Sequence, residues 1–235
     1  MDVIHTGPYG VNTLIVPLCG PYVFIVDPAC CSMCCDEEKF ISFLKSKSYV
    51  PAAIVLTHGH FDHVAGLKVL SREYKGIPVL IHKEDAVMIG KNSGKVQEDI
   101  LYSVGFESFI ESVSDLPEPD FFLEDKKTLS EIILKHNFKN DDTEIKNAFS
   151  LCRVLHTPGH TKGSACLYNE KEKLLISGDT VFYHSYGRTD FTGGSEGEMI
   201  KSLRKIYSTL PHDVKVYPGH EVTGFLLEEN LQAVC

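Results

Sequence analysis

The chain has 235 residues, of which 43% are apolar and 23% charged, a balance typical of a folded globular protein and not of a disordered one. Its formal net charge of -9 argues against broad binding to the phosphate backbone of nucleic acids. No apolar run approaches the roughly 20 residues that a membrane helix needs, and the N-terminus lacks the basic and apolar segments of a signal peptide. We therefore expect a cytoplasmic protein that binds neither nucleic acid nor membranes.

Apolar runs of strand length alternate with helix-like stretches in the first part of the chain. The segment from Asp36 to Lys47 predicts a helix, because its apolar residues recur on one face. A second helix is expected from His63 to Glu73. Residues 83–125 have weak periodicity, so we expect one or two short helices and a loop there, as an insertion or a lid. The strands expected in this part are 11–18, 22–28, 52–57 and 78–82.

The second part of the chain shows more strands and one long helix. Glu196 to Leu210 is an amphipathic helix with an apolar face. The strands expected here are 128–136, 145–156, 164–168, 173–179 and 214–220. No repeat or linker is evident, so we expect one domain over residues 1–235. Strands with interspersed helices predict a layered fold in which helices cover sheets.

The strongest candidate for chemistry is His58-Gly59-His60-Phe61-Asp62-His63, at the end of a predicted strand. Imidazole and carboxylate are the ligands that zinc and similar divalent metals prefer. A loop can turn successive side chains toward one point, whereas a straight strand sends alternate ones to opposite faces. Glycine between the first two histidines permits a tight turn. The segment therefore predicts a metal site.

Three further candidate ligands follow predicted strands later in the chain. His160 lies in a His-Thr-Pro-Gly-His segment, Asp179 in Ser-Gly-Asp-Thr, and His220 in Pro-Gly-His. Taken singly, a histidine after Pro-Gly is more often a turn residue than a metal ligand, and an aspartate in Ser-Gly-Asp-Thr is more often a helix cap. Functional residues tend to gather on loops at one end of the strands of a rigid scaffold. We therefore expect these residues to join the first cluster.

These residues, in this order, resemble the pattern of the metallo-β-lactamase superfamily, and the resemblance covers nearly the whole chain. It implies an α+β fold, an αββα four-layer sandwich with the metal site at one edge. It also implies which residues bind metal: His58, His60 and His160 hold one ion, Asp62, His63 and His220 hold a second, and Asp179 bridges the two.

Within this superfamily the chain is similar to the short members of the glyoxalase II-like group, the hydroxyacylglutathione hydrolases. The segment Gly187-Arg188-Thr189-Asp190-Phe191 carries this likeness. Full-length members of that group have a further helical domain that helps to bind glutathione, and this chain ends too soon to carry one. The prediction of substrate-contacting residues is therefore less well supported than the prediction of the metal ligands.

The resemblance implies hydrolysis of a thioester such as an acyl-glutathione, with S-lactoylglutathione as an example. Two divalent ions, zinc with iron or manganese as alternatives, would share a hydroxide that attacks the thioester carbonyl. Asp62 is expected to orient this nucleophile as well as to bind metal. Arg188 could bind a substrate carboxylate through its planar guanidinium, but a pair with Asp190 that stiffens the loop explains it equally well. Lys162 and Tyr183 are weaker candidates for substrate contacts.

Two other functions stay open. A persulfide dioxygenase of the same fold would use one iron, held at His58, His160 and Asp179. A non-catalytic protein that senses metal or redox state would instead depend on the cysteines at 30, 31, 34 and 35. Structural zinc sites usually draw ligand pairs from two separated places, and no second cysteine pair exists, so we expect ordinary reduced thiols near a helix start. The oligomeric state is not indicated.

Overall fold

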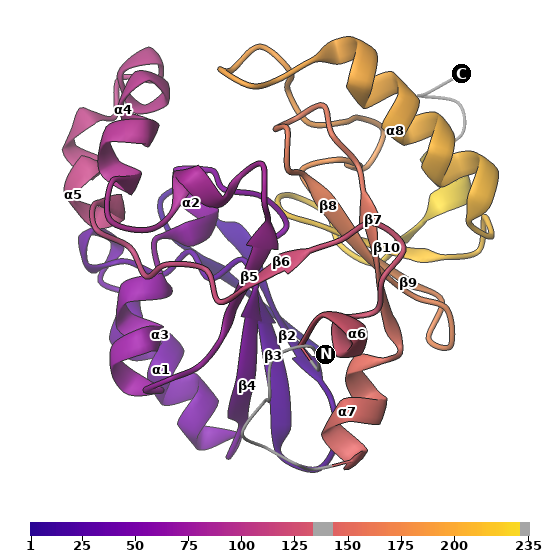
Figure 1. Cartoon of the computed structure of the whole chain (residues 1–235), viewed down its shortest axis with the longest axis horizontal. Coiled ribbons are helices and arrows are strands. Elements are labelled where there is room, and N and C mark those ends of the chain that lie inside the picture. Colours follow the sequence, from indigo (N-terminus) through magenta and orange to yellow (C-terminus); the bar gives the residue numbers. More distant parts are fainter. Residues whose placement is uncertain (134–142, 231–235) are drawn as a thin grey trace. The chain divides into compact units, whose positions relative to one another are not determined.

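A computed structural model describes residues 1–133 and 143–230. The chain divides into two compact units, Met1–Phe122 and Leu123–Cys235, and each is described by itself. Both combine a β-sheet with helices, as the α+β prediction requires (Figure 1). In the described ranges, none of the helices has both the length and the apolar character that a membrane crossing demands.

The first unit is built on a six-stranded sheet with the strand order β1-β2-β3-β4-β5-β6. The first three strands are antiparallel neighbours, and β3, β4 and β5 run parallel. The side chains of the parallel strands β3, β4 and β5 are almost all buried, as is usual for parallel strands, and so are those of β2. The strands are β1 (Asp2–Thr6), β2 (Val11–Pro17), β3 (Tyr22–Val26), β4 (Val50–Val55), β5 (Val79–His82) and β6 (Phe121–Leu123).

Helices α1 (Glu37–Ser46) and α3 (Leu67–Glu73) lie alongside this sheet (Figure 1). Each buries one apolar face, and an ion pair between Lys45 and Glu73 joins the two helices at 2.5 Å. The helix predicted from His63 to Glu73 is interrupted, because Gly66 donates its N–H to the Pro28 carbonyl at 2.8 Å. The short α2 (Phe61–Val64) precedes this break.

Residues 83–125 contain short helices, as expected, but they also contain strand β6, which was not expected. The helices are η2 (Ala86–Met88), α4 (Ser93–Ser103), η3 (Glu107–Phe109) and α5 (Ile110–Val113). Aromatic rings fix their place against α2: Phe61 lies 5.7 Å from Phe109 and 6.4 Å from Phe106, measured between ring centroids. The residue between the candidate ligands His60 and Asp62 is thus anchored in the hydrophobic core.

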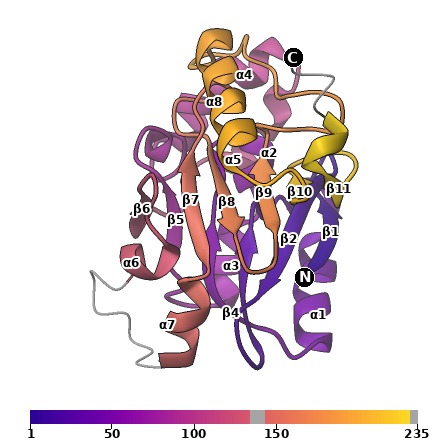
Figure 2. The ribbon, with the colours of Figure 1, turned by 90° about the vertical axis from the view of Figure 1, so that its right-hand side faces the viewer.

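The second unit carries a five-stranded sheet with the order β11-β10-β9-β8-β7. Helix α8 (Glu196–Thr209) lies along this sheet (Figure 2) and packs Met199, Leu203 and Ile206 into one core with strand residues such as Leu175 and Val216. The helix matches its prediction closely. The strands are β7 (Cys152–His156), β8 (Ala165–Asn169), β9 (Leu174–Gly178), β10 (Lys215–Pro218) and β11 (Phe225–Leu226).

The strand predicted at 128–136 is wrong over its described part, which forms helix α6 (Leu129–Ile133). The cause is a capping box: the Thr128 hydroxyl accepts from the Glu131 N–H at 3.2 Å, and the Glu131 carboxylate accepts from the Thr128 N–H at 2.8 Å. This pairing satisfies N–H groups that a helix start leaves open. Residues 134–136 lie outside the described residues.

The strand predicted at 145–156 is wrong in its first half. Residues Thr143–Phe149 form helix α7, and only Cys152–His156 form β7. Ile145 and Phe149 are four positions apart and both are buried, which is the spacing of one helix face. In the first part of this segment the apolar residues thus recur with helical spacing, and only the later part forms a strand.

The cysteine-rich segment between β3 and α1 holds free thiols in two different environments. Cys30 and Cys31 are buried, whereas Cys35 is exposed. The Asp36 carboxylate holds the segment in place by accepting from the Cys31 N–H and the Gly7 N–H, both at 2.7 Å. Burial raises the pKa of the Cys31 thiol to about 12 and raises the pKa of Cys30 further.

These pKa values predict selective thiol labelling. A thiol with a pKa of about 12 carries roughly a thousandfold less thiolate at pH 8 than an ordinary cysteine, and only the thiolate reacts. Labelling of the folded protein with iodoacetamide, mapped by mass spectrometry, should therefore modify Cys35 quickly and Cys30 and Cys31 only after unfolding. Pretreatment with oxidant should not change this pattern. Equal rates at Cys31 and Cys35, or loss of labelling after oxidant, would support a redox role.

Candidate metal centre

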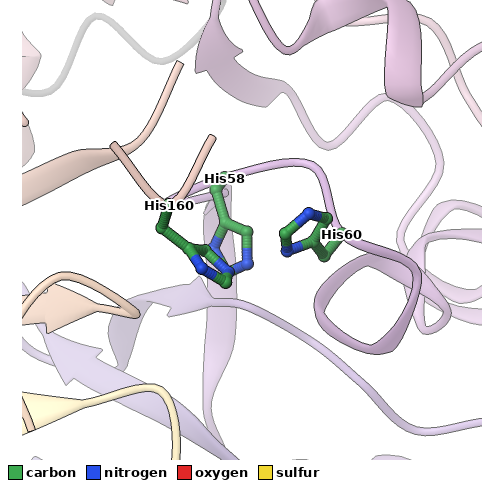
Figure 3. Close-up of side chains that lie close together, drawn as sticks. All are labelled: His58, His60 and His160. Atoms are coloured by element: carbon green, nitrogen blue, oxygen red, sulfur yellow. The ribbon is translucent and has the colours of Figure 1, made fainter. Parts of the chain in front are cut away.

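In the first unit the candidate ligands follow β4, at the edge where parallel strands end. Because β3, β4 and β5 run parallel, the residues that follow them meet at the same sheet edge. Asp27 follows β3, the histidine segment follows β4, and Asp85 follows β5. Figure 3 shows the His58 and His60 rings on the loop after β4. All the candidate ligands of this segment are buried, namely His58, His60, Asp62 and His63.

These side chains lie against one another as a ligand cluster would. The His58 ring centroid lies 4.9 Å from that of His60 and 4.1 Å from that of His63. The Asp62 carboxylate oxygen Oδ2 lies 3.8 Å from His63 Nε2. The first unit therefore brings together all four candidates that were predicted for it.

Asp27 is a candidate supporting residue that the sequence analysis missed. It is buried, and its carboxylate accepts from the Thr57 N–H at 2.7 Å and from the Thr57 hydroxyl at 2.6 Å. Its Oδ2 also lies 3.1 Å from His63 Nδ1. The carboxylate is an acceptor, so it favours the His63 tautomer that carries the proton on Nδ1 and the lone pair on Nε2.

The Asp27 carboxylate also orients His58, through the hydroxyl of Thr57. Its Nδ1 lies 3.0 Å from the Thr57 hydroxyl oxygen, whose proton is already donated to Asp27. That oxygen must therefore accept from His58 Nδ1–H, which leaves the lone pair on Nε2. Asp27, Thr57 and His58 thus form a chain of hydrogen bonds that sets the tautomer of a candidate ligand.

In the second unit the candidate ligands also follow strands that run in one direction. The β8 strand is antiparallel to both β7 and β9, and β9 is parallel to β10, so β7, β9 and β10 end at the same edge. His160 follows β7, Asp179 follows β9, and His220 follows β10. Asp179 Oδ2 lies 3.4 Å from His160 Nε2 and 3.6 Å from His220 Nε2. This unit therefore brings its three predicted ligands together around one carboxylate.

His160 has its ring orientation set by the backbone. Its Nδ1 lies 2.8 Å from the Arg188 carbonyl oxygen, which only accepts, so the proton is on Nδ1 and the lone pair on Nε2. Figure 3 shows this ring on its loop. The loop is packed tightly, because a Cβ on Gly159 would lie 2.4 Å from the backbone of Met199 in α8. A Cβ on Gly187 would lie 1.9 Å from the Asp179 carbonyl oxygen.

Two of the three candidate substrate residues, Arg188 and Tyr183, have side-chain partners within the protein. Arg188 makes two hydrogen bonds of 2.8 Å with the Asp190 carboxylate, and its guanidinium lies 3.7 Å from the Phe191 ring centroid. This pair lowers the pKa of Asp190 to about 2. Tyr183 is 36% exposed and packs on Phe225. Lys162 is exposed. Their contacts with substrate stay predictions.

The donor set fits a divalent metal. It consists of buried imidazole nitrogens and carboxylates, the ligands that zinc and iron accept in proteins. Three of the imidazoles present Nε2 while Nδ1 is held by a carboxylate, a hydroxyl or a backbone carbonyl, and such support is usual for metal-ligating histidine. Among the described residues, no candidate ligand group contains a cysteine.

Comparison with known proteins agrees with this geometry. The model of the metallo-β-lactamase superfamily matches residues 23–220. An uncharacterized protein of Aquifex aeolicus is 34% identical over 94% of this chain and 89% of its own length. The probable metallo-hydrolase YqgX of Bacillus subtilis is 29% identical over 84% of this chain and 81% of its own length. The hydroxyacylglutathione hydrolase of Pelagibacter ubique is 29% identical over 89% of this chain and 66% of its own length.

Solved structures share the fold. The B3 metallo-β-lactamase BLEG-1 aligns with a TM-score of 0.76 and 26% identity over 98% of this chain and 96% of its own. TTHA1623, solved in a di-iron-bound form, aligns with a TM-score of 0.74 and 25% identity over 99% of this chain and 98% of its own. The fold is thus the predicted one, with mixed sheets flanked by helices, and the chain belongs to the metallo-β-lactamase superfamily.

Proposed function

We propose that the protein is a metal-dependent hydrolase that cleaves a thioester such as an acyl-glutathione. The observation that carries this proposal is the set of buried histidines whose Nε2 atoms hold lone pairs, beside carboxylates, at one sheet edge in each unit. The names of two relatives support it, because one is named a probable metallo-hydrolase and the other a hydroxyacylglutathione hydrolase.

The ligand assignment follows the superfamily pattern. His58, His60 and His160 would hold one divalent ion, Asp62, His63 and His220 would hold a second, and Asp179 would bridge them. When bound, the ions would lower the pKa of a shared water and polarise the substrate carbonyl. Nitrogen and carboxylate ligands suit zinc, while the di-iron form of TTHA1623 makes iron an alternative.

The chain's own residues orient and protect the reactants. Asp62 lies in the first turn of α2 with its carboxylate largely buried, so it can accept a hydrogen bond from the attacking water and fix its direction. Asp27 holds His63 and, through Thr57, His58 in the tautomers that bind metal. A thiolate is a fairly good leaving group, so the thioester needs little help from a proton donor.

A persulfide dioxygenase is the rival activity for this fold. ETHE1 from Myxococcus xanthus aligns with a TM-score of 0.63 but only 17% identity, which supports a common fold alone. A persulfide dioxygenase would need one iron at His58, His160 and Asp179. It would have no use for the second ligand group of Asp62, His63 and His220, yet Asp179 Oδ2 lies 3.6 Å from His220 Nε2, close to its 3.4 Å from His160 Nε2. Hydrolysis is therefore the better-supported chemistry.

Metal content tests the ligand assignment. We expect close to two divalent ions per chain by elemental analysis of the purified protein. Substitution His58→Ala or His220→Ala should each remove about one of them, since each strips a ligand from a different ion. The exposed His212→Ala is the matched control and should keep both. Two ions in all three variants would refute the assignment, and one iron in the wild type would favour the dioxygenase.

Turnover tests the reaction. The metal-loaded protein should release thiol from S-lactoylglutathione or another acyl-glutathione, and Asp62→Asn should lower kcat by about 10²- to 10⁴-fold, the usual contribution of a positioned acid–base group. Oxygen uptake with glutathione persulfide is measured in parallel. Uptake without thioester cleavage would overturn the proposal. Metal binding without either activity across a broad thioester panel would support a non-catalytic sensor.

Arg188 offers a test of substrate recognition. If its guanidinium binds a substrate carboxylate, Arg188→Ala should raise KM by about ten- to a hundredfold with little change in kcat, because a charged hydrogen bond is worth about 1.5–3 kcal/mol. The exposed Arg204→Ala serves as the control. If Arg188 only pairs with Asp190, both Arg188→Ala and Asp190→Ala should lower the melting temperature alike and leave KM unchanged.

A further inference from the structure

Gly59, which separates the candidate ligands His58 and His60, has both of its backbone groups held by distant side chains. Its N–H donates to Asp85 Oδ2 at 3.0 Å, from a residue 26 positions along the chain. Its carbonyl accepts from Gln97 Nε2 at 2.6 Å, from a residue 38 positions along. Both side chains are fully buried, at 1% and 0% exposure.

These two hydrogen bonds act on the two peptide planes that carry the histidines. The Gly59 N–H belongs to the peptide that joins His58 to Gly59, and the Gly59 carbonyl belongs to the peptide that joins Gly59 to His60. A peptide unit is planar, so holding one of its atoms fixes the direction of the plane. With both planes fixed, the directions in which the two imidazoles leave the backbone are fixed as well.

The surroundings of Gly59 leave no room for a side chain at this position. A Cβ at this position would lie 2.6 Å from the Met88 Cβ. Gln97 also donates to the Met88 carbonyl at 3.1 Å, so one amide joins the ligand loop, η2 and α4. Hydrogen bonds between buried groups are costly to lose, because neither partner gains water in exchange.

We propose that Asp85 and Gln97 are positioning residues for the metal centre, which hold His58 and His60 in the geometry that binds metal. Residues 83–125 then serve as a fixed support of the ligand loop and not as a lid. The inference rests on the proposed function, since it takes His58 and His60 as metal ligands. It assigns to α4 a role in metal affinity although α4 supplies no ligand.

The test is metal affinity of the apo protein, measured by zinc titration against a chromogenic chelator. Gln97→Leu keeps the size of the side chain but removes the donor, and Asp85→Ala removes the acceptor. Each should weaken zinc binding by about tenfold or more, the usual cost of losing support behind a ligand. Asp85→Asn keeps an oxygen that can accept from Gly59 and should stay near the wild type.

Ser93→Ala is the matched control. Ser93 lies on the same helix and is fully buried, and its hydroxyl donates to the Gly90 carbonyl at 2.7 Å and accepts from the Leu116 N–H at 3.2 Å, so its hydrogen bonds lie outside the ligand loop. It should lower the melting temperature without changing zinc affinity. The absorption spectrum of the cobalt-substituted protein gives a second readout, which should shift in Gln97→Leu and not in Ser93→Ala.

The outcomes separate the two claims. If the wild type binds no zinc, the ligand assignment fails and the positioning role fails with it. If the wild type binds zinc and Gln97→Leu and Asp85→Ala match it in affinity and cobalt spectrum, the positioning role alone is overturned. Equal losses of affinity in Ser93→Ala and Gln97→Leu would also overturn it, because they would reflect general destabilisation. Should Gln97→Leu not fold, the contrast between Asp85→Ala and Asp85→Asn decides.

Discussion

The buried carboxylate of Asp27 is the interaction on which the first half of the candidate centre depends. Removing a carboxylate from water is costly unless it is fully hydrogen-bonded, and here the Thr57 N–H, the Thr57 hydroxyl and His63 all contact it. The residue adopts a left-handed conformation, with φ of 49°, directly after β3. This sharp turn points the carboxylate back across the end of the neighbouring β4 strand, where the ligand loop begins.

In both units the candidate site residues lie at the ends of strands. In each, three strands that run in one direction supply the residues of the site from the loops that follow them. Loops at strand ends can carry polar groups because the sheet beneath them is rigid and apolar. Glycines at 59, 159 and 187 then let backbone and side chains approach more closely than any other residue would allow. The geometry of the candidate ligands in this chain is therefore set by loops that tight packing holds in place on a rigid sheet.

The candidate ligands at 58–63 could be identified from the sequence because their pattern is local. Three histidines and an aspartate within six positions indicate a metal site without knowledge of the fold. The supporting residues could not be found in this way. Asp27 lies 36 positions from His63 and reaches it because β3 and β4 are paired in parallel, while Gln97 lies 38 positions from Gly59 and reaches it from helix α4. An acidic residue directly after a buried strand was the available clue to Asp27.

The two misassigned strands have a common cause. Both segments are rich in apolar residues, and short apolar runs fit a buried strand or a helix equally well. The spacing of individual residues distinguishes helix from strand here. Thr128 and Glu131 have the spacing of a capping box, and Ile145 and Phe149 have helical spacing. The capping residues Thr128 and Glu131, given more weight than hydrophobicity, would have predicted helix α6 correctly.

The contrast between ligands and substrate residues explains why the chemistry is better defined than the substrate. The ligands are buried, and neighbours hold His58, His63 and His160 in a single tautomer. Arg188 and Lys162, by contrast, lie at the surface, and the guanidinium of Arg188 is already paired with Asp190. An exposed pair is worth little energetically and rearranges at low cost. A scaffold of this kind can keep one metal-dependent reaction while its exposed residues change the substrate it accepts.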